Sequence, residues 1–211
     1  LYQQKKCDGF ILVGGGSAID IGKAIALLAN HTGKISDYED GVESSLEIKD
    51  KIDPIIAVPT TSGTGSEVGG SSVISATKDQ RKIIIWSPYL LPKKVIADSS
   101  LTFSLPANLT AATGVDALTH CVEAFLAKGY HPMADGIALE GVRLIKENLL
   151  TCYKNPNNAR ARDGMLMASM MGAVAFQKGL GVTHSCAHAL SSCYDMHHGL
   201  ANALLLKSAM K

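Results

Sequence analysis

The chain has 211 residues, of which 46% are hydrophobic and 18% are charged, and its formal net charge is +1. That length and apolar content suffice for one large domain or two modest ones with a sizeable core. The small net charge gives no reason to expect a nucleic-acid surface or an anionic-membrane patch, and no apolar run reaches the roughly 18 residues of a membrane-spanning helix. We therefore expect no nucleic-acid partner and no membrane association.

Five cysteines without a CxxC pair are more typical of a reducing compartment than of a disulfide framework, so we expect a cytoplasmic protein. The chain has no initiator methionine, and it opens and stops within helix-like sequence. We expect it to be an excerpt of a longer protein.

The first half of the chain alternates short β-rich runs with helical or turn segments. Residues 17–30 carry apolar positions at helical spacing directly after the run 10–13, which predicts a strand, a turn and a helix. Residues 34–52 are polar and are expected to form an irregular surface excursion. The continuously apolar runs are expected to be buried on both faces, as in a sheet covered by helices. The candidate strands are 10–13, 55–58, 72–75, 83–85 and 94–97.

From Pro106 onward the strand signal disappears and helical patterns take over. This switch predicts a boundary between two domains, residues 1–105 and residues 106–211. We thus expect a Rossmann-like α/β part with a mostly parallel sheet, followed by an all-α domain. The expected helices span residues 107–127, 134–152, 157–178, 183–193 and 199–210.

A glycine-rich turn, Gly14-Gly15-Gly16-Ser17, follows the first predicted strand. Glycines there let the backbone approach a phosphate, and the N-terminus of the next helix offers unpaired N–H groups. The turn alone is a weak signal, because an ordinary strand-to-helix turn explains it almost as well. It also lacks the third glycine of the GxGxxG fingerprint, where Ile19 stands, and it lacks the GK[ST] of a P-loop.

A second polar, glycine-containing loop, Pro59–Glu67 (PTTSGTGSE), follows the second predicted strand. In open α/β sheets the ligand crevice lies at the carboxyl ends of the strands. Two such loops at that edge favour a nucleotide site over a pair of ordinary βα turns. We expect Gly14–Ser17 and Pro59–Thr64 to face one cleft.

Five of the seven histidines fall into two short clusters. Asp116 and His120 are spaced i,i+4, which places them on one face of a helix, and His184 and His188 repeat that spacing. One carboxylate and several imidazoles suit Fe(II) or Zn(II). A single histidine is more often a hydrogen-bonded core or surface residue, but the repeated geometry favours a metal site. Glu123 is expected to be an exposed or capping carboxylate rather than a ligand.

The chain resembles the iron-dependent (group III) alcohol dehydrogenases from about residue 8 to its C-terminus. Members of that family are about twice as long and have the dehydroquinate synthase-like two-domain architecture. The resemblance therefore implies a partial dinucleotide-binding α/β domain over residues 1–105 and a partial all-helical metal-binding domain over residues 106–211. It is carried by GGGSAID, VPTTSGTGSEV, SPYLLPKKVIADSSL, SLPANLTAATGVDALTHCVEAF and THSCAHALSSCYDMHHGLANALLL.

The resemblance also implies roles for single residues. His188 would be catalytic, lying beside the metal near the nicotinamide and substrate without being a ligand, as a proton relay or as an orienting group. The implied metal ligands are Asp116, His120, His184 and His198. The implied contacts to the cofactor, from its pyrophosphate and ribose to the far side of an interdomain cleft, are Gly15, Gly16, Ser17, Asp20, Thr60, Thr61, Lys82 and Leu101. The sequence departs from the family's usual pattern at Ser191-Ser192, where many members have Gly-Gly, and at His197, where many have Pro.

The function implied by the resemblance is reversible oxidation of a primary alcohol or diol to an aldehyde, with NAD or NADP accepting the hydride. The metal would be Fe(II), with Zn(II) left open, the partner a small-molecule alcohol or aldehyde, and the protein a homo-oligomer. One alternative is a zinc-dependent polyol dehydrogenase or a non-redox cyclase of the dehydroquinate synthase type on the same scaffold. Another is a non-catalytic metal- or nucleotide-binding module.

Overall fold

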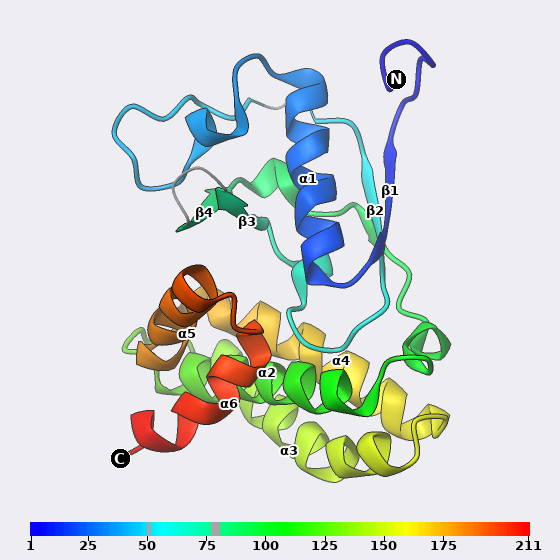
Figure 1. Cartoon of the computed structure of the whole chain (residues 1–211), viewed down its shortest axis with the longest axis vertical. Helices are drawn as coiled ribbons and strands as arrows, with labels where there is room; N and C mark the ends of the chain where they lie inside the picture. The colour runs from blue at the N-terminus through cyan, green and yellow to red at the C-terminus, as the bar shows by residue number, and fades with distance from the viewer. Residues whose placement is uncertain (50–51, 77–80) are drawn as a thin grey trace. The chain divides into compact units, whose positions relative to one another are not determined.

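The computed structural model describes residues 1–49, 52–76 and 81–211, which form two compact units (Figure 1). The α/β unit comprises Leu1–Pro59 and Ser66–Ile96, and the helical unit comprises Thr60–Gly65 and Ala97–Lys211. The loop Thr60–Gly65 thus belongs with the helices. The domain boundary that we place near residue 105 stays a prediction.

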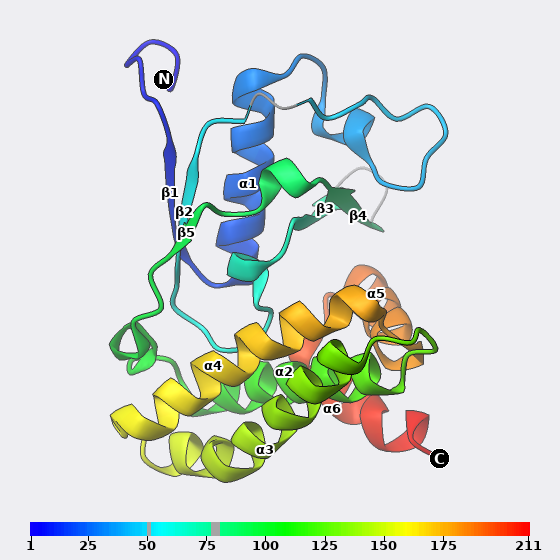
Figure 2. The ribbon, with the colours of Figure 1, turned by 180° about the vertical axis from the view of Figure 1, so that it is seen from behind.

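The α/β unit is built on a three-stranded parallel sheet with strand order β1-β2-β5 (Figure 2). Its strands confirm the predicted ones, although the last is two residues shorter. Gly14 of the first strand lies opposite Pro59 of the second, so both strands end at the same edge of the sheet. The strands are β1 (Phe10–Gly14), β2 (Ile55–Pro59) and β5 (Lys94–Val95).

Helix α1 (Gly16–Asn30) follows β1, as predicted, and packs on one face of the sheet. Gly22 permits a close approach, because a Cβ there would lie 2.4 Å from Cδ2 of Leu12. On the other face Ile11 and Val13 are 70% and 60% exposed. The expectation of burial on both faces is therefore wrong for β1, since α1 covers only one of its faces.

The predicted strands 72–75 and 83–85 form a separate antiparallel pair, β3 (Ser71–Ala76) with β4 (Arg81–Trp86). Ile83 and Ile85 are buried while Ile84 is 40% exposed, which is the alternation expected of a strand with one covered face. The segment 34–52 is irregular over its described residues, apart from a 3-10 turn, and residues 50–51 lie outside them. The 3-10 turns span Ile35–Tyr38, Ser66–Val68, Pro88–Leu90, Ser99–Thr102 and Phe176–Lys178.

A buried lysine ties α1 to the turn before β3. Nζ of Lys23 donates hydrogen bonds to the backbone oxygens of Ser66, Gly69 and Ser71 at 2.6, 2.7 and 2.8 Å. Burial lowers the pKa of Lys23 to about 8, and the nearby Asp20 carboxylate offsets part of this effect. Lys23 therefore acts as an internal cross-link that satisfies three carbonyls.

Replacing Lys23 with methionine should lower the free energy of unfolding by about 3 kcal/mol, because one buried and two partly buried carbonyls and one carboxylate would lose their cationic partner. Urea unfolding followed by circular dichroism measures this change. The matched control is Lys5→Met, since Lys5 is exposed. If the two variants were equally stable, the hydrogen bonds of Lys23 would make no net contribution to the free energy of unfolding.

The helical unit confirms the five predicted helices, and residues 110–211, all described, contain no strand. Its core is formed mainly by small side chains, including Ala117, Ala138 and Ala168, together with Ile145 and Met165. Small residues let the helices approach closely, which brings polar side chains of different helices near one another. The helices are α2 (Ala107–Leu126), α3 (Pro132–Lys154), α4 (Ala159–Ala175), α5 (Val182–Tyr194) and α6 (His198–Ala209).

Among the described residues, no single helix is long and apolar enough to cross a membrane. One bent pair, Ala159–Lys178 with Val182–Tyr194 at 107°, reaches the required length and composition when its members are taken together.

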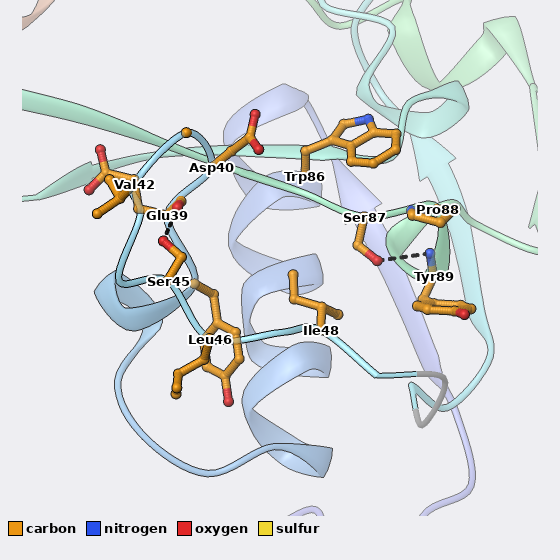
Figure 3. A pocket seen from close by; sticks show the side chains of 12 residues that line it. Glu39, Asp40, Val42, Ser45, Leu46, Ile48, Trp86, Ser87, Pro88 and Tyr89 are labelled. Atoms are coloured by element: carbon orange, nitrogen blue, oxygen red, sulfur yellow. Dashed lines mark hydrogen bonds between the residues drawn. The ribbon is translucent and has the colours of Figure 1, made fainter.

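A pocket of about 330 Å³ lies in the α/β unit between the segment 38–48 and the segment 86–89 (Figure 3). Its wall includes the carboxylates of Glu39 and Asp40 and the rings of Trp86 and Tyr89. None of the predicted site residues lines it.

Candidate metal centre

Helix α2 carries Asp116 and His120 one turn apart on a buried face, with 3% and 5% of their surfaces exposed. Two glycines let neighbouring helices approach that face. A Cβ at Gly199 would lie 2.2 Å from the carbonyl oxygen of Ala112, and one at Gly172 would lie 3.1 Å from the Cβ of His120. Helices α6 and α4 therefore pack tightly against α2 around these two side chains.

The four predicted metal ligands lie together. The candidate ligand atoms of Asp116, His120 and His184 are within 4.8 Å of one another, and in the described part of the chain theirs is the one such group. Nε2 of His184 is 3.7 Å from Oδ1 of Asp116, and Nε2 of His198 is 3.6 Å from the same oxygen. Helices α2, α5 and α6 thus deliver side chains to one point, although ligation itself stays a prediction.

The other two histidines of the clusters lie outside this group. His188 is half-buried on α5, and its ring stands edge-on to that of His198 with centroids 5.0 Å apart. His197 is exposed and immediately precedes α6. The structure therefore places His188 next to the cluster and His197 at the surface.

Glu123, on the same helix as His120, is a buried capping residue. Its carboxylate accepts hydrogen bonds from the backbone N–H groups of Gly181 and Thr183 at 3.0 and 2.7 Å, at the start of α5. It also accepts a hydrogen bond from Nδ1 of His184 at 2.6 Å. The capping interpretation holds, but the cap is made on another helix and the residue is not exposed.

The bond from Glu123 decides which nitrogen of His184 is available. Nδ1 donates its proton to the carboxylate, so in the neutral ring the lone pair is on Nε2, the atom on the Asp116 side. Burial by itself would raise the pKa of Glu123, but the hydrogen bonds from His184 and from α5 lower it to about 2. Glu123 is thus ionised at neutral pH and holds His184 with Nε2 on the side of Asp116.

The electrostatics of the remaining side chains agree with a cation site. Burial would raise the pKa of Asp116, but the three histidines around it lower that pKa well below its usual range. Burial lowers the pKa of His120 to about 4, so its imidazole is neutral near pH 7. Burial by itself would lower the pKa of His184, but its hydrogen bonds with Asp116 and Glu123 raise it. An ionised carboxylate with imidazole nitrogens is a donor set that fits a borderline divalent ion, which displaces any proton from the nitrogens it binds.

The segment Thr60–Gly65, which is part of the predicted cofactor loop Pro59–Glu67, packs closely on helices α2 and α4. A Cβ at Gly63 would lie 2.7 Å from the Cβ of Thr113 on α2, and one at Gly65 would lie 2.2 Å from the Cβ of Ala173 on α4. Gly65 also has a φ of +61°, in the region that favours glycine. These glycines explain why a loop can lie so close to the helices, and Thr60 and Thr61 are half-exposed on it.

The other predicted cofactor residues lie in different surroundings. Ser17 is exposed at the start of α1, and Gly14, just before it, has a φ of +151° with no room for a Cβ, which would lie 2.6 Å from the Cβ of Ala18. The Asp20 carboxylate is used within the α/β unit, accepting hydrogen bonds from the hydroxyl of Ser66 and from the backbone N–H of Val73. Gly15 and Gly16 form the same turn as Ser17, Lys82 lies in β4, and Leu101 is 40% exposed. Their contacts with a cofactor stay predictions.

A glycine turn at a helix N-terminus suits a phosphate group, and a cluster of one aspartate and three histidines suits a divalent ion. Both features agree with the family that the sequence resembles. Comparison with known sequences supports the resemblance to the iron-dependent alcohol dehydrogenases. Residues 1–99 match the profile of iron-containing alcohol dehydrogenase, and residues 110–211 match that of the C-terminal part of the Fe-containing alcohol dehydrogenase family. The chain belongs to the iron-containing alcohol dehydrogenase family.

Individual relatives support this assignment and the predicted fold class. The chain is 46% identical to a 4-hydroxybutyrate dehydrogenase from Cupriavidus necator, over all of its own length and 56% of the relative. It is 42% identical to a 1,3-propanediol dehydrogenase from Citrobacter freundii, over 98% of its length and 52% of the relative. The structure of sulfoacetaldehyde reductase from Bifidobacterium kashiwanohense in complex with NAD+ matches with a TM-score of 0.92 and 35% identity, over 98% of this chain and 55% of that one. The chain thus spans about half the length of the relatives it matches.

Proposed function

We propose that the protein interconverts a primary alcohol or diol and the corresponding aldehyde, with NAD or NADP as the hydride carrier and Fe(II) as the metal. The convergence of Asp116, His120, His184 and His198 carries this proposal. The family supports it, as do relatives named for 4-hydroxybutyrate and 1,3-propanediol and a neighbour solved with NAD+.

The protein's own side chains would bind the ion and orient its ligands. When bound, the ion would supply the Lewis acidity that lowers the pKa of the alcohol hydroxyl. Glu123 keeps Nε2 of His184 free to bind, and the burial of Asp116 and His120 excludes water from the donor set. In the α/β unit, the N-terminus of α1 after the glycine turn would bind the cofactor pyrophosphate.

The choice of iron over zinc follows the family description, since the donor set suits both ions. The use of NAD is supported by the neighbour solved with NAD+. We also propose a homo-oligomer in the cytoplasm, a location with which the five free cysteines agree.

The experiment that tests the proposal is metal analysis of anaerobically purified protein, combined with an assay of a primary-alcohol and diol panel against NAD and NADP. We expect about one iron per chain and formation of reduced cofactor with at least one alcohol. Stoichiometric zinc without alcohol oxidation would point to a non-redox relative, and metal without any turnover would point to a binding module.

His188 is the proposed catalytic histidine, acting as a proton relay outside the ligand set. Replacing it with asparagine should leave the metal content unchanged and slow turnover by about 10²-fold, the lower end of what a positioned acid or base contributes. Metal analysis and steady-state kinetics on the same preparation measure both quantities. Loss of metal from this variant would instead make His188 a ligand.

A further inference from the structure

Asn202 is a fully buried polar side chain on α6, one turn after His198. Its Nδ2 lies 2.6 Å from Oδ1 of Asp116. The same nitrogen is 3.3 Å from Nε2 of His184 and 3.3 Å from Nε2 of His198. One amide nitrogen therefore contacts three of the four proposed metal ligands.

The Asp116 carboxylate determines which end of the Asn202 amide faces it. The Asp116 carboxylate accepts hydrogen bonds and does not donate them when ionised, so the Asn202 nitrogen must face it and donate. Hydrogen bonds to an ionised group are roughly twice as strong as neutral ones. The 3.3 Å separations from the two histidine nitrogens are longer than an ordinary hydrogen bond, so Asp116 is the main partner.

The oxygen atom of the Asn202 amide lowers the stability of the fold. Oδ1 of Asn202 is buried and makes no hydrogen bond to the described part of the chain. An unsatisfied buried acceptor costs about 1–3 kcal/mol, so an apolar side chain of similar size would pack there at lower cost. The bond to Asp116 is what an apolar residue cannot supply.

We propose that Asn202 is a positioning residue for the metal centre, holding the Asp116 carboxylate in the orientation in which it binds the ion. Because Asn202 and His198 share α6 while Asp116 is on α2, the same bond fixes the helix that brings His198 to the site. This inference rests on the proposed function, since it assigns a role toward the ion that the four ligands would hold. The loss of such an orienting neighbour weakens metal binding about 10–100-fold in metal sites generally.

The test measures metal affinity rather than turnover. Zn(II) and Co(II) affinities are determined by competition with a chromophoric chelator for the wild type, Asn202→Leu and Asn202→Ala, and the visible absorption of Co(II) reports the geometry of the ligands. The matched control is Asn148→Leu, because the Asn148 amide donates to the backbone oxygen of Leu144 in its own helix, at 2.7 Å, and to no other group in the described part of the chain. We expect affinities about 10–100-fold weaker and altered Co(II) absorption in the Asn202 variants, and neither change in the control.

Each other outcome overturns the inference. Unchanged affinity in a folded Asn202 variant would show that the amide does not orient Asp116. Tighter binding would show that it competes with the ion for the ligand atoms. If neither variant folded, even with excess Zn(II), Asn202 would serve the core of the helical unit. If the wild type bound neither ion, the proposed function itself would fail, which separates the two hypotheses.

Discussion

His198→Ala should lose most of its bound metal and nearly all of its turnover. His198 is the one proposed ligand that comes from α6, and its Nε2 is 3.6 Å from Oδ1 of Asp116. Without it the ion would keep one oxygen and two nitrogens. We expect metal affinity to fall by at least about 100-fold, the upper end of the effect of removing a neighbour that only orients a ligand. Metal analysis after dialysis against a weak chelator measures this loss.

The neighbouring histidine provides the matched control. His197→Ala makes the same chemical change one residue earlier, at an exposed position outside the cluster. It should retain wild-type metal content and turnover. Equal metal loss in both variants would mean that the start of α6, and not the imidazole of His198, matters to the site.

Most of the secondary structure could be predicted from hydrophobic periodicity, because each element carries its own pattern. What periodicity could not predict is which neighbour covers each face. Ile11 and Val13 belong to a continuously apolar run, yet both are exposed, since α1 covers the other face of an edge strand. Likewise, strands β3 and β4 have the expected composition, but periodicity does not show that they pair with each other in a separate sheet.

The site shows the same division between local and tertiary information. The i,i+4 spacing of Asp116 and His120 predicts their common face without knowledge of any other helix. The contacts of Glu123 with His184 and of Asn202 with Asp116 arise only when α5 and α6 approach α2, and neither contact was predicted, although a capping role for Glu123 was. A spacing signal did exist, because Glu123 is seven residues from Asp116 and Asn202 is four from His198, so both lie on the ligand faces of their helices.

Glu123→Gln should weaken metal binding by about 10–100-fold although glutamine has nearly the same shape. The carboxylate accepts hydrogen bonds from three backbone N–H groups at the start of α5 and from Nδ1 of His184. A glutamine amide has one oxygen for these donors, and its NH2 group must face one of them. If it faces His184, it donates to Nδ1 and favours the tautomer with the proton on Nε2, the nitrogen that must be bare to bind metal.

The same substitution also removes a negative charge from the N-terminus of α5, so the free energy of unfolding should fall by about 2 kcal/mol in the presence of chelator. Chelator competition and urea unfolding measure the two effects separately. Glu147→Gln is the control, because Glu147 is an exposed glutamate of α3 whose partner, Arg143, lies 2.6 Å away at the surface. A loss of stability with unchanged metal affinity would reduce Glu123 to a helix cap. If Glu123 sets the tautomer of His184, Glu123→Gln must bind metal more weakly than its loss of stability explains. Glu147→Gln must not show this weakening.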